Sequence, residues 1–207
     1  MTTYFPFERI YELDLNGIKH YIEVEKGDVN VPVLTSPCDK EGTTILIQMV
    51  IQNRLDIVKY LVENGARINI ANNMFGWTAL VSAVYNATMN VSYFTMVNYL
   101  IDNGADIKCR FRFRNNDITL LRFAIERSSF YLAEILLNKG IKFDVRDLDF
   151  AKKYKRVDSD KKIIEFMSSQ LISAISHREY LKIYKNVNFY LIDDLALIVM
   201  DYFTKSN

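Results

Sequence analysis

Hydrophobic and polar positions follow one another along this chain in a pattern that occurs three times. The copies are residues 42–69 (GTTILIQMVIQNRLDIVKYLVENGARIN), 76–108 (GWTALVSAVYNATMNVSYFTMVNYLIDNGADIK) and 117–143 (DITLLRFAIERSSFYLAEILLNKGIKF). In each copy, two apolar runs with helical spacing are separated by polar residues, which predicts a pair of short helices. Because the copies follow one another, with their opening threonines Thr44, Thr78 and Thr119 at intervals of 34 and 41 residues, the sequence predicts a protein built from stacked repeats.

Each copy begins and ends with residues that favour helix boundaries. A threonine followed two residues later by leucine opens the copy, and the threonine side chain can cap the first helix. A glycine closes the copy and can end the second helix in the left-handed conformation. These residues are Thr44, Thr78 and Thr119 at the start and Gly65, Gly104 and Gly140 at the end. The opening threonine and the closing glycine are 26 residues apart in the second copy and 21 in the others, and we attribute this difference of five residues to an insertion at 86–95 that enlarges the loop between its helices.

The Thr-x-Leu opener, the small residues Ala83 and Ala124, the IVKYLVENGA helix and the polar hairpins between copies resemble ankyrin repeats. Met49 occupies the small-residue position of the first copy, so we expect different packing there. The resemblance implies an all-α solenoid of three full repeats with a degenerate repeat at each end.

The two ends of the array depart from the repeat pattern. Residues 16–30 resemble a second helix and its exit hairpin, with 5–13 as a shortened first helix, and 147–170 resemble a degenerate capping repeat. Terminal repeats are expected to be atypical because one of their faces meets water. We therefore expect an array over residues 1–170 and a helical C-terminal segment over 171–207.

The C-terminal segment contains an amphipathic stretch, LIDDLALIVMDYF (191–203), and two interpretations of it remain open. In the first interpretation, it is a helix that only covers the last repeat. In the second, it resembles the F-box-like PRANC module of poxviral and some intracellular bacterial ankyrin proteins. In that family the module recruits the Skp-type adaptor of cullin–RING ubiquitin ligases. The matching positions are Leu191, Asp194, Leu195, Val199, Tyr202 and Phe203, whereas Ile192 replaces the proline of the motif.

Composition and charge narrow the function classes. The formal net charge of +1 gives no overall attraction for nucleic acid or an anionic membrane. Two cysteines and two isolated histidines do not make a disulfide framework or a zinc centre. No catalytic arrangement is recognisable, so we expect no enzyme activity, no cofactor and no metal. The apolar run LALIVM is too short to cross a bilayer, and we expect a cytoplasmic, monomeric protein, in the host cytoplasm if it is an effector.

The segment CRFRFRNN (109–116) lengthens the hairpin before the third copy and alternates arginine with phenylalanine. This period of two predicts a strand with one cationic and one aromatic side. Three interpretations remain open. The arginine and phenylalanine side chains contact a protein partner, or the phenylalanines pack beneath the hairpin while the arginines are solvated, or the arginines contact the phosphates of a nucleic acid.

The resemblance implies a non-enzymatic protein–protein interaction module. Its contact positions lie on the concave surface formed by the hairpins and the first helices, which we call the hairpin-side surface. With the lengthened hairpin included, these positions are Asp39, Lys40, Ile51, Gln52, Asn72, Met74, Phe75, Trp77, Tyr85, Asn86, Arg110, Phe111, Arg112, Phe113, Arg114, Asn116, Ile118, Glu126 and Arg127.

Two functional hypotheses follow from this assignment. The chain is a viral or intracellular-bacterial effector or adaptor that captures a host protein, with residues 188–207 linking it to a cullin–RING ligase. Alternatively, it is a stand-alone scaffold or inhibitor that blocks its partner, and the C-terminal helix only caps the array.

Overall fold

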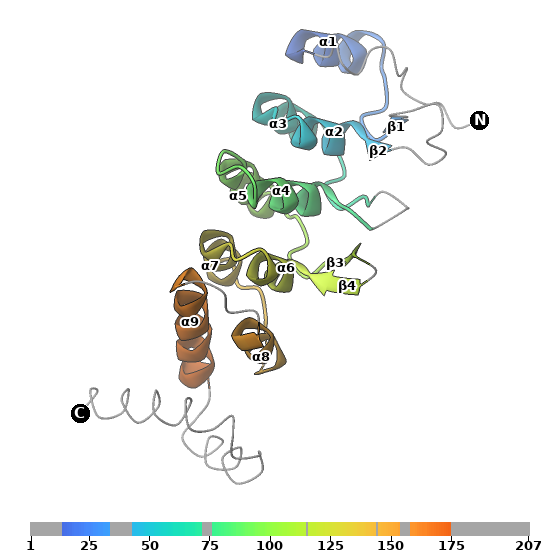
Figure 1. Cartoon of the computed structure of the whole chain (residues 1–207). Coiled ribbons are helices and arrows are strands. Elements are labelled where there is room, and N and C mark those ends of the chain that lie inside the picture. The colour runs from blue at the N-terminus through green and yellow to red at the C-terminus, as the bar shows by residue number, and fades with distance from the viewer. Residues whose placement is uncertain are drawn as a thin grey trace.

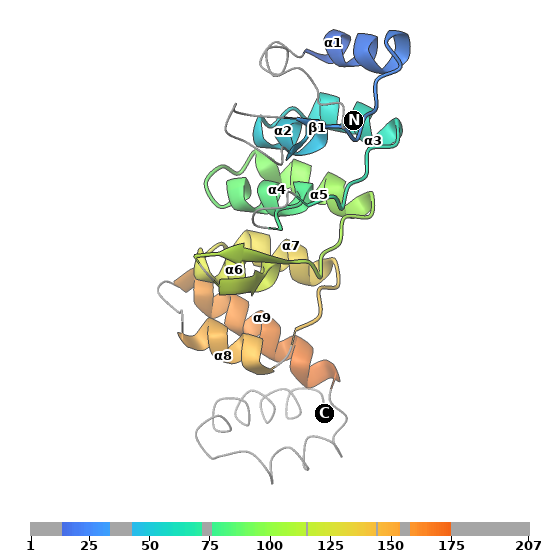
Figure 2. The same ribbon diagram turned by 90° about the vertical axis from the view of Figure 1, so that its right-hand side faces the viewer.

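The computed structural model of the chain describes residues 14–33, 43–71, 76–114, 116–143, 145–153 and 158–174. Pairs of antiparallel helices stack on one another to form an elongated array (Figure 1). The first helix of each full repeat lies beside the hairpins, and the second helix lies in a row behind it (Figures 1 and 2). Among the described residues, no helix is long and apolar enough to span a membrane.

The order of elements follows the repeat pattern of the sequence. The N-terminal helix α1 (Leu15–Lys19) continues into the π-helical turn η2 (His20–Val24). The helix pairs are α2 (Ile45–Ile51) with α3 (Leu55–Glu63), α4 (Ala79–Ala87) with α5 (Tyr93–Asp102), α6 (Leu120–Glu126) with α7 (Phe130–Asn138), and α8 (Val145–Lys153) with α9 (Asp158–Ala174). The antiparallel strand pairs are β1 (Pro32–Val33) with β2 (Thr43–Thr44), and β3 (Arg110–Phe113) with β4 (Asn116–Thr119).

The predicted helix boundaries are confirmed. The side-chain oxygens of Thr44, Thr78 and Thr119 accept hydrogen bonds from the backbone N–H groups of Ile47, Val81 and Arg122, at 3.2, 3.3 and 3.3 Å. The closing glycines Gly65, Gly104 and Gly140 have φ angles of 88°, 90° and 82°, a region that residues with a Cβ atom rarely adopt. The threonine caps satisfy backbone donors at helix starts that water does not reach, since Thr44 and Thr78 are buried.

The five extra residues of the second repeat are distributed over three places, so the expectation of an enlarged loop is only partly correct. Two residues lengthen α4 relative to α2 and α6, one lengthens α5 relative to α3 and α7, and two lengthen the connection between the helices. The three-residue connections 52–54 and 127–129 each place a non-glycine residue, Asn53 or Ser128, at positive φ. The five-residue connection 88–92 joins α4 and α5 without any residue at positive φ.

A continuous apolar core lies between the two rows of helices. Leu46, Ile57, Leu80, Leu100 and Leu136 are at most 1% exposed and belong to one cluster that extends through successive repeats. Met49 is fully buried at the position where the other repeats have Ala83 and Ala124, so the first repeat places a larger side chain between its neighbours, as expected.

Both ends of the described array continue the stack. At the N-terminus α1 packs against α3, as expected for a residual second helix, while residues 5–13 lie outside the described part. At the C-terminus α8 packs on α6 and α9 on α7, which is the arrangement of a further repeat. Because the stretch SSQLISA contains no glycine or proline, α9 continues to Ala174. The expected boundary between residues 170 and 171 therefore lies inside this helix.

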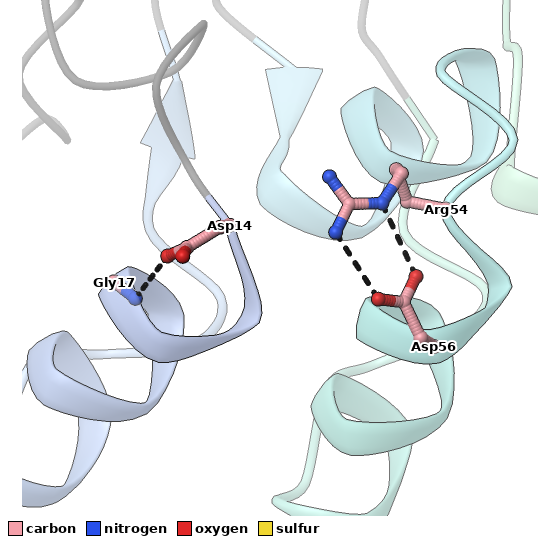
Figure 3. Close-up of polar contacts among 4 residues, drawn as sticks. All are labelled: Asp14, Gly17, Arg54 and Asp56. Carbon is pink, nitrogen blue, oxygen red and sulfur yellow. Dashed lines mark hydrogen bonds and ion pairs between the residues drawn. The ribbon is translucent and has the colours of Figure 1, made fainter.

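Two local polar contacts order the start of the array (Figure 3). The carboxylate of Asp14 accepts a hydrogen bond of 2.7 Å from the backbone N–H of Gly17 and caps α1. Arg54 donates to both carboxylate oxygens of Asp56, at 3.2 and 3.1 Å, across the connection between α2 and α3. This hydrogen bonding lowers the pKa of Asp56 and raises that of Arg54, so both groups stay charged, although an exposed pair of this kind contributes at most about 1 kcal/mol.

Asparagine side chains join the exit loop of one repeat to the exit loop of the next. Asn69 donates to the carbonyl oxygen of Gly104 at 3.1 Å and accepts from the backbone N–H of Asp106 at 2.8 Å. Asn30 makes the same two contacts one repeat earlier, to Gly65 and Arg67. We call these contacts the asparagine bridges. In the following repeat, the equivalent position is Lys108, which has no acceptor atom for the second bond.

The substitution Asn69→Ala should lower the free energy of unfolding by about 1 kcal/mol, because it removes two hydrogen bonds between repeats. Urea denaturation followed by far-ultraviolet circular dichroism measures the change. Lys108→Ala is the matched control and should change the stability by less than about 0.5 kcal/mol. Equal effects of the two substitutions would show that the asparagine bridge does not stabilise the stack.

Candidate protein-interaction surface

Five aromatic side chains pack beneath the β3–β4 hairpin and connect it to the helices of two repeats. We call them the aromatic cluster. Phe123 of α6 has ring-centroid distances of 5.5 Å to Phe111, 5.0 Å to Phe113 and 5.9 Å to Tyr85 of α4. Trp77 lies 5.1 Å from Tyr85 and 6.0 Å from Phe111. Tyr85 and Phe123 are stacked and the other pairs are tilted or edge-to-face, and these arrangements are favourable at such distances, so the cluster holds the hairpin against the helices.

The hairpin has one aromatic and one cationic side, as its alternating sequence predicts. Phe111 is paired with Ile118 across the two strands, and these side chains are 2% and 6% exposed. Arg110 and Arg112 alternate with the phenylalanines and are exposed. The indole Nε1–H of Trp77 donates to the carbonyl oxygen of Arg112 at 3.3 Å, so the preceding repeat also binds the backbone of β3.

Arg114 lies at the tip of the hairpin with a positive φ of 48°. Its guanidinium lies 5.3 Å from the ring centroid of Phe113 and 3.8 Å from the carboxylate of Glu126 at the end of α6. The tip of the hairpin therefore leans over the first helix of its own repeat. Because the Arg114 side chain is 71% exposed, the ion pair leaves most of the guanidinium accessible to solvent.

The predicted contact residues fall into three groups. Exposed side chains belong to Ile51, Gln52, Arg110, Arg112, Arg114 and Asn116, and partly buried ones to Trp77, Tyr85, Asn86, Phe113, Glu126 and Arg127. Phe111 and Ile118 are buried, because the inward side of the hairpin packs on α6, so these two side chains offer no surface to a partner. Asp39, Lys40, Asn72, Met74 and Phe75 lie outside the described residues, as do Leu191, Asp194, Leu195, Val199, Tyr202 and Phe203.

The described residues offer no evident reactive group. They contain no cluster of histidine, cysteine, aspartate and glutamate able to hold a metal ion. Burial, with a smaller contribution from the charge of Asp106, raises the pKa of Cys109 to about 11. Only a very small fraction of this thiol is ionised at neutral pH, and the thiolate is the nucleophilic form. Cys109 is therefore a poor nucleophile at neutral pH.

Comparison with known proteins agrees with the repeat architecture. Residues 14–111 match a family model described as ankyrin repeats in three copies. The match begins at the residue that caps α1 and ends within β3, so the third full repeat lies beyond it. The expected all-α ankyrin solenoid is confirmed.

Several curated ankyrin proteins are similar to this chain. It is 28% identical over 153 residues to a putative ankyrin repeat protein of Rickettsia felis, covering 62% of this chain and 38% of that protein. It is 30% identical over 130 residues to a putative ankyrin repeat protein of Coxiella burnetii, covering 59% and 36%. It is 37% identical over 65 residues to the Notch-regulated ankyrin repeat-containing protein A of Danio rerio, covering 31% and 57%. The chain covers less than two thirds of the length of each of these relatives.

The aromatic cluster should be a major source of stability. We expect Phe111→Ala to lower the free energy of unfolding by about 3 kcal/mol, because it leaves a cavity among buried aromatic rings. Arg112→Ala, the next residue of the same strand, should change it by less than about 0.5 kcal/mol. Thermal and urea denaturation of the two variants provide the comparison. A small effect of Phe111→Ala would contradict the packing role of the hairpin.

Proposed function

Because the chain carries ankyrin repeats in an all-α solenoid, we propose that it acts as a protein-interaction module whose hairpin-side surface holds a segment of another protein. One observation carries this proposal. Gln52, Asn86 and Arg127 each lie eight residues after the opening threonine, are not fully buried, and belong to three successive repeats. Helices pack about 8–10 Å apart, so the three positions follow a line of roughly 20 Å. An extended segment of about six residues has this length.

The charges of the hairpin favour a partner segment that carries carboxylates. Arg110 and Arg112 are exposed, and Arg110 donates to the carbonyl oxygen of Asp117 at 3.1 Å, which holds its side chain along the hairpin. Guanidinium groups bind carboxylates through two parallel hydrogen bonds. The net charge of +1 of the whole chain argues against nucleic acid as the partner, because phosphate binding depends on extensive positive charge.

The more specific hypothesis is that the chain is an effector that links its captured partner to a cullin–RING ligase through residues 188–207. The comparisons give no support to the F-box-like resemblance of this segment, and its residues lie outside the described part of the chain. The matched sequence positions remain its only support. The competing hypothesis, a scaffold or inhibitor without recruitment, requires nothing from these residues beyond capping the array.

Substitutions on the hairpin-side surface should abolish partner capture without unfolding the chain. In affinity capture from the native cell type, we expect proteins retained by the wild type to be lost with the triple variant Gln52→Arg/Arg110→Glu/Arg112→Glu. All three side chains are exposed. The matched control is Lys59→Glu/Asn138→Arg/Lys142→Glu, which makes the same change in net charge at exposed residues of the second helices or just after them. Capture that survives the first variant, or is lost equally with both, would contradict the proposal.

The ligase hypothesis has a separate test. A pull-down with the purified Skp-type adaptor should retain the wild-type chain and should lose the variant Leu195→Asp/Val199→Asp. Both substitutions place a charge on the apolar side of the amphipathic stretch. If the wild type does not bind the adaptor, the recruitment hypothesis is wrong, and the scaffold or inhibitor hypothesis remains.

A further inference from the structure

A second exposed surface lies at the turns that join the two helices of each repeat. We call it the turn edge. The five-residue connection between α4 and α5 carries Met89 and Val91, which are 66% and 74% exposed. This connection is the loop that bulges from the left of the stack in Figure 2. Among the large hydrophobic side chains of the described residues, these two are the most exposed.

The apolar surface continues from this connection into the next repeat. Phe94 and Tyr131 are the second residues of α5 and α7, and their ring centroids lie 4.7 Å apart in an edge-to-face arrangement. Tyr131 is 54% exposed, and Phe94 is half-buried beneath it. The contact between Phe94 and Tyr131 spans two repeats, and Met89 and Val91 lie on the connection that leads into the helix of Phe94, with the Phe94 N–H donating to the carbonyl oxygen of Val91 at 3.1 Å.

Hydrogen bonds hold this connection in a defined position. The Asn53 side-chain amide donates to the Ser92 hydroxyl at 2.8 Å, and the Tyr93 hydroxyl donates to the carbonyl oxygen of Ile51 at 2.6 Å. The carboxamide oxygen of Asn90 accepts from the backbone N–H of Ser92 at 3.0 Å. The connection is therefore tied to the preceding repeat as well as to itself, and its two apolar side chains project from a positioned backbone.

The fold does not require these apolar residues. The equivalent connections of the first and third repeats are shorter and consist of polar residues, Gln-Asn-Arg at 52–54 and Arg-Ser-Ser at 127–129. Large apolar side chains gathered on an exposed surface contribute little to stability and favour association, so their presence is informative. The insertion in the second repeat places apolar surface where the other repeats place polar groups.

The charge beside this surface indicates the chemistry of its partner. Arg127 donates to the sulfur of Met89 at 3.4 Å, and sulfur is a weak acceptor. No carboxylate among the described residues pairs with Arg127. In contrast, Arg54, in the connection between the helices of the first repeat, forms an ion pair with Asp56. An occupant that brings a carboxylate would complete the hydrogen bonding of Arg127.

We propose that the turn edge, formed by Met89, Val91, Phe94, Tyr131 and Arg127, is a second docking site that binds an amphipathic segment of another protein. The segment presents large apolar side chains to the four apolar residues and a carboxylate to Arg127. The apolar residues of this site lie on the turns and on the first turns of the second helices, away from the hairpins, and Arg127 borders both this site and the hairpin-side surface.

A displayed library of random peptides of about 16 residues, the length of a helix of roughly 24 Å, provides the probe. The library is selected on the full wild-type chain in the presence of excess soluble Met89→Ser/Val91→Ser variant, and the enriched peptides are titrated by fluorescence anisotropy. We expect peptides with apolar residues and at least one acidic residue, bound about tenfold more weakly by the double variant. Arg127→Gln should weaken binding several-fold, and more for acidic peptides than for their amide analogues.

Val24→Ser is the matched control, because Val24 is 65% exposed at the N-terminal end of the array, and it should leave binding unchanged. Circular dichroism establishes that each variant folds. The proposal is overturned if no enriched peptide depends on Met89 and Val91, or if the enriched peptides are basic. It is also overturned if these residues instead mediate self-association in sedimentation experiments, or binding of the chain to phosphatidylcholine vesicles.

Discussion

The structure depends on apolar helix faces that no single helix pair can bury. Each pair in the array has a core side that must be covered by the next pair, so burial of side chains such as Leu80 and Leu100 requires stacking. The regular elements follow from this requirement. A buried threonine must cap the first helix because water does not reach its backbone donors, and a glycine must end the second helix so that the chain can return to the next repeat.

The contacts between successive repeats change along the array although the backbone pattern is constant. The first two junctions use the asparagine bridges and place Lys19 and Lys59 over the rings of Tyr60 and Tyr99. At the third junction Lys108 replaces the bridging asparagine, and the aromatic cluster joins the two repeats instead. At the fourth, Arg122 pairs with Asp147 at 2.6 Å and lies over the ring of Phe150. The helix pairs thus keep one stacking arrangement, whereas the side chains that stabilise each junction differ.

The repeat architecture could be predicted from the sequence because its signals are local. Thr78 and Val81 lie within one helical turn, and Gly104 lies two residues after the last residue of α5, so spacing alone indicates their roles. The asparagine bridges were not predicted, since Asn69 and Gly104 lie 35 residues apart and only stacking brings them together. Which side chains of the hairpin are exposed was predicted only in part. Alternation identified two sides of the strand. The family pattern placed Ile118 among the contact positions, and the extension along the hairpin added Phe111, but both side chains are buried, and Phe111 packs on Phe123.

The position of Trp77 determines what the intrinsic fluorescence of this protein reports. It is the single tryptophan of the chain, and its indole N–H is bonded to the hairpin of the following repeat. In a solenoid, stability is approximately a sum of repeat and junction contributions, so one junction can open while the others stay closed. Tryptophan emission therefore monitors the contact between the second and third repeats, whereas circular dichroism averages over every helix. A difference between the two signals would measure how cooperatively the array behaves as one unit.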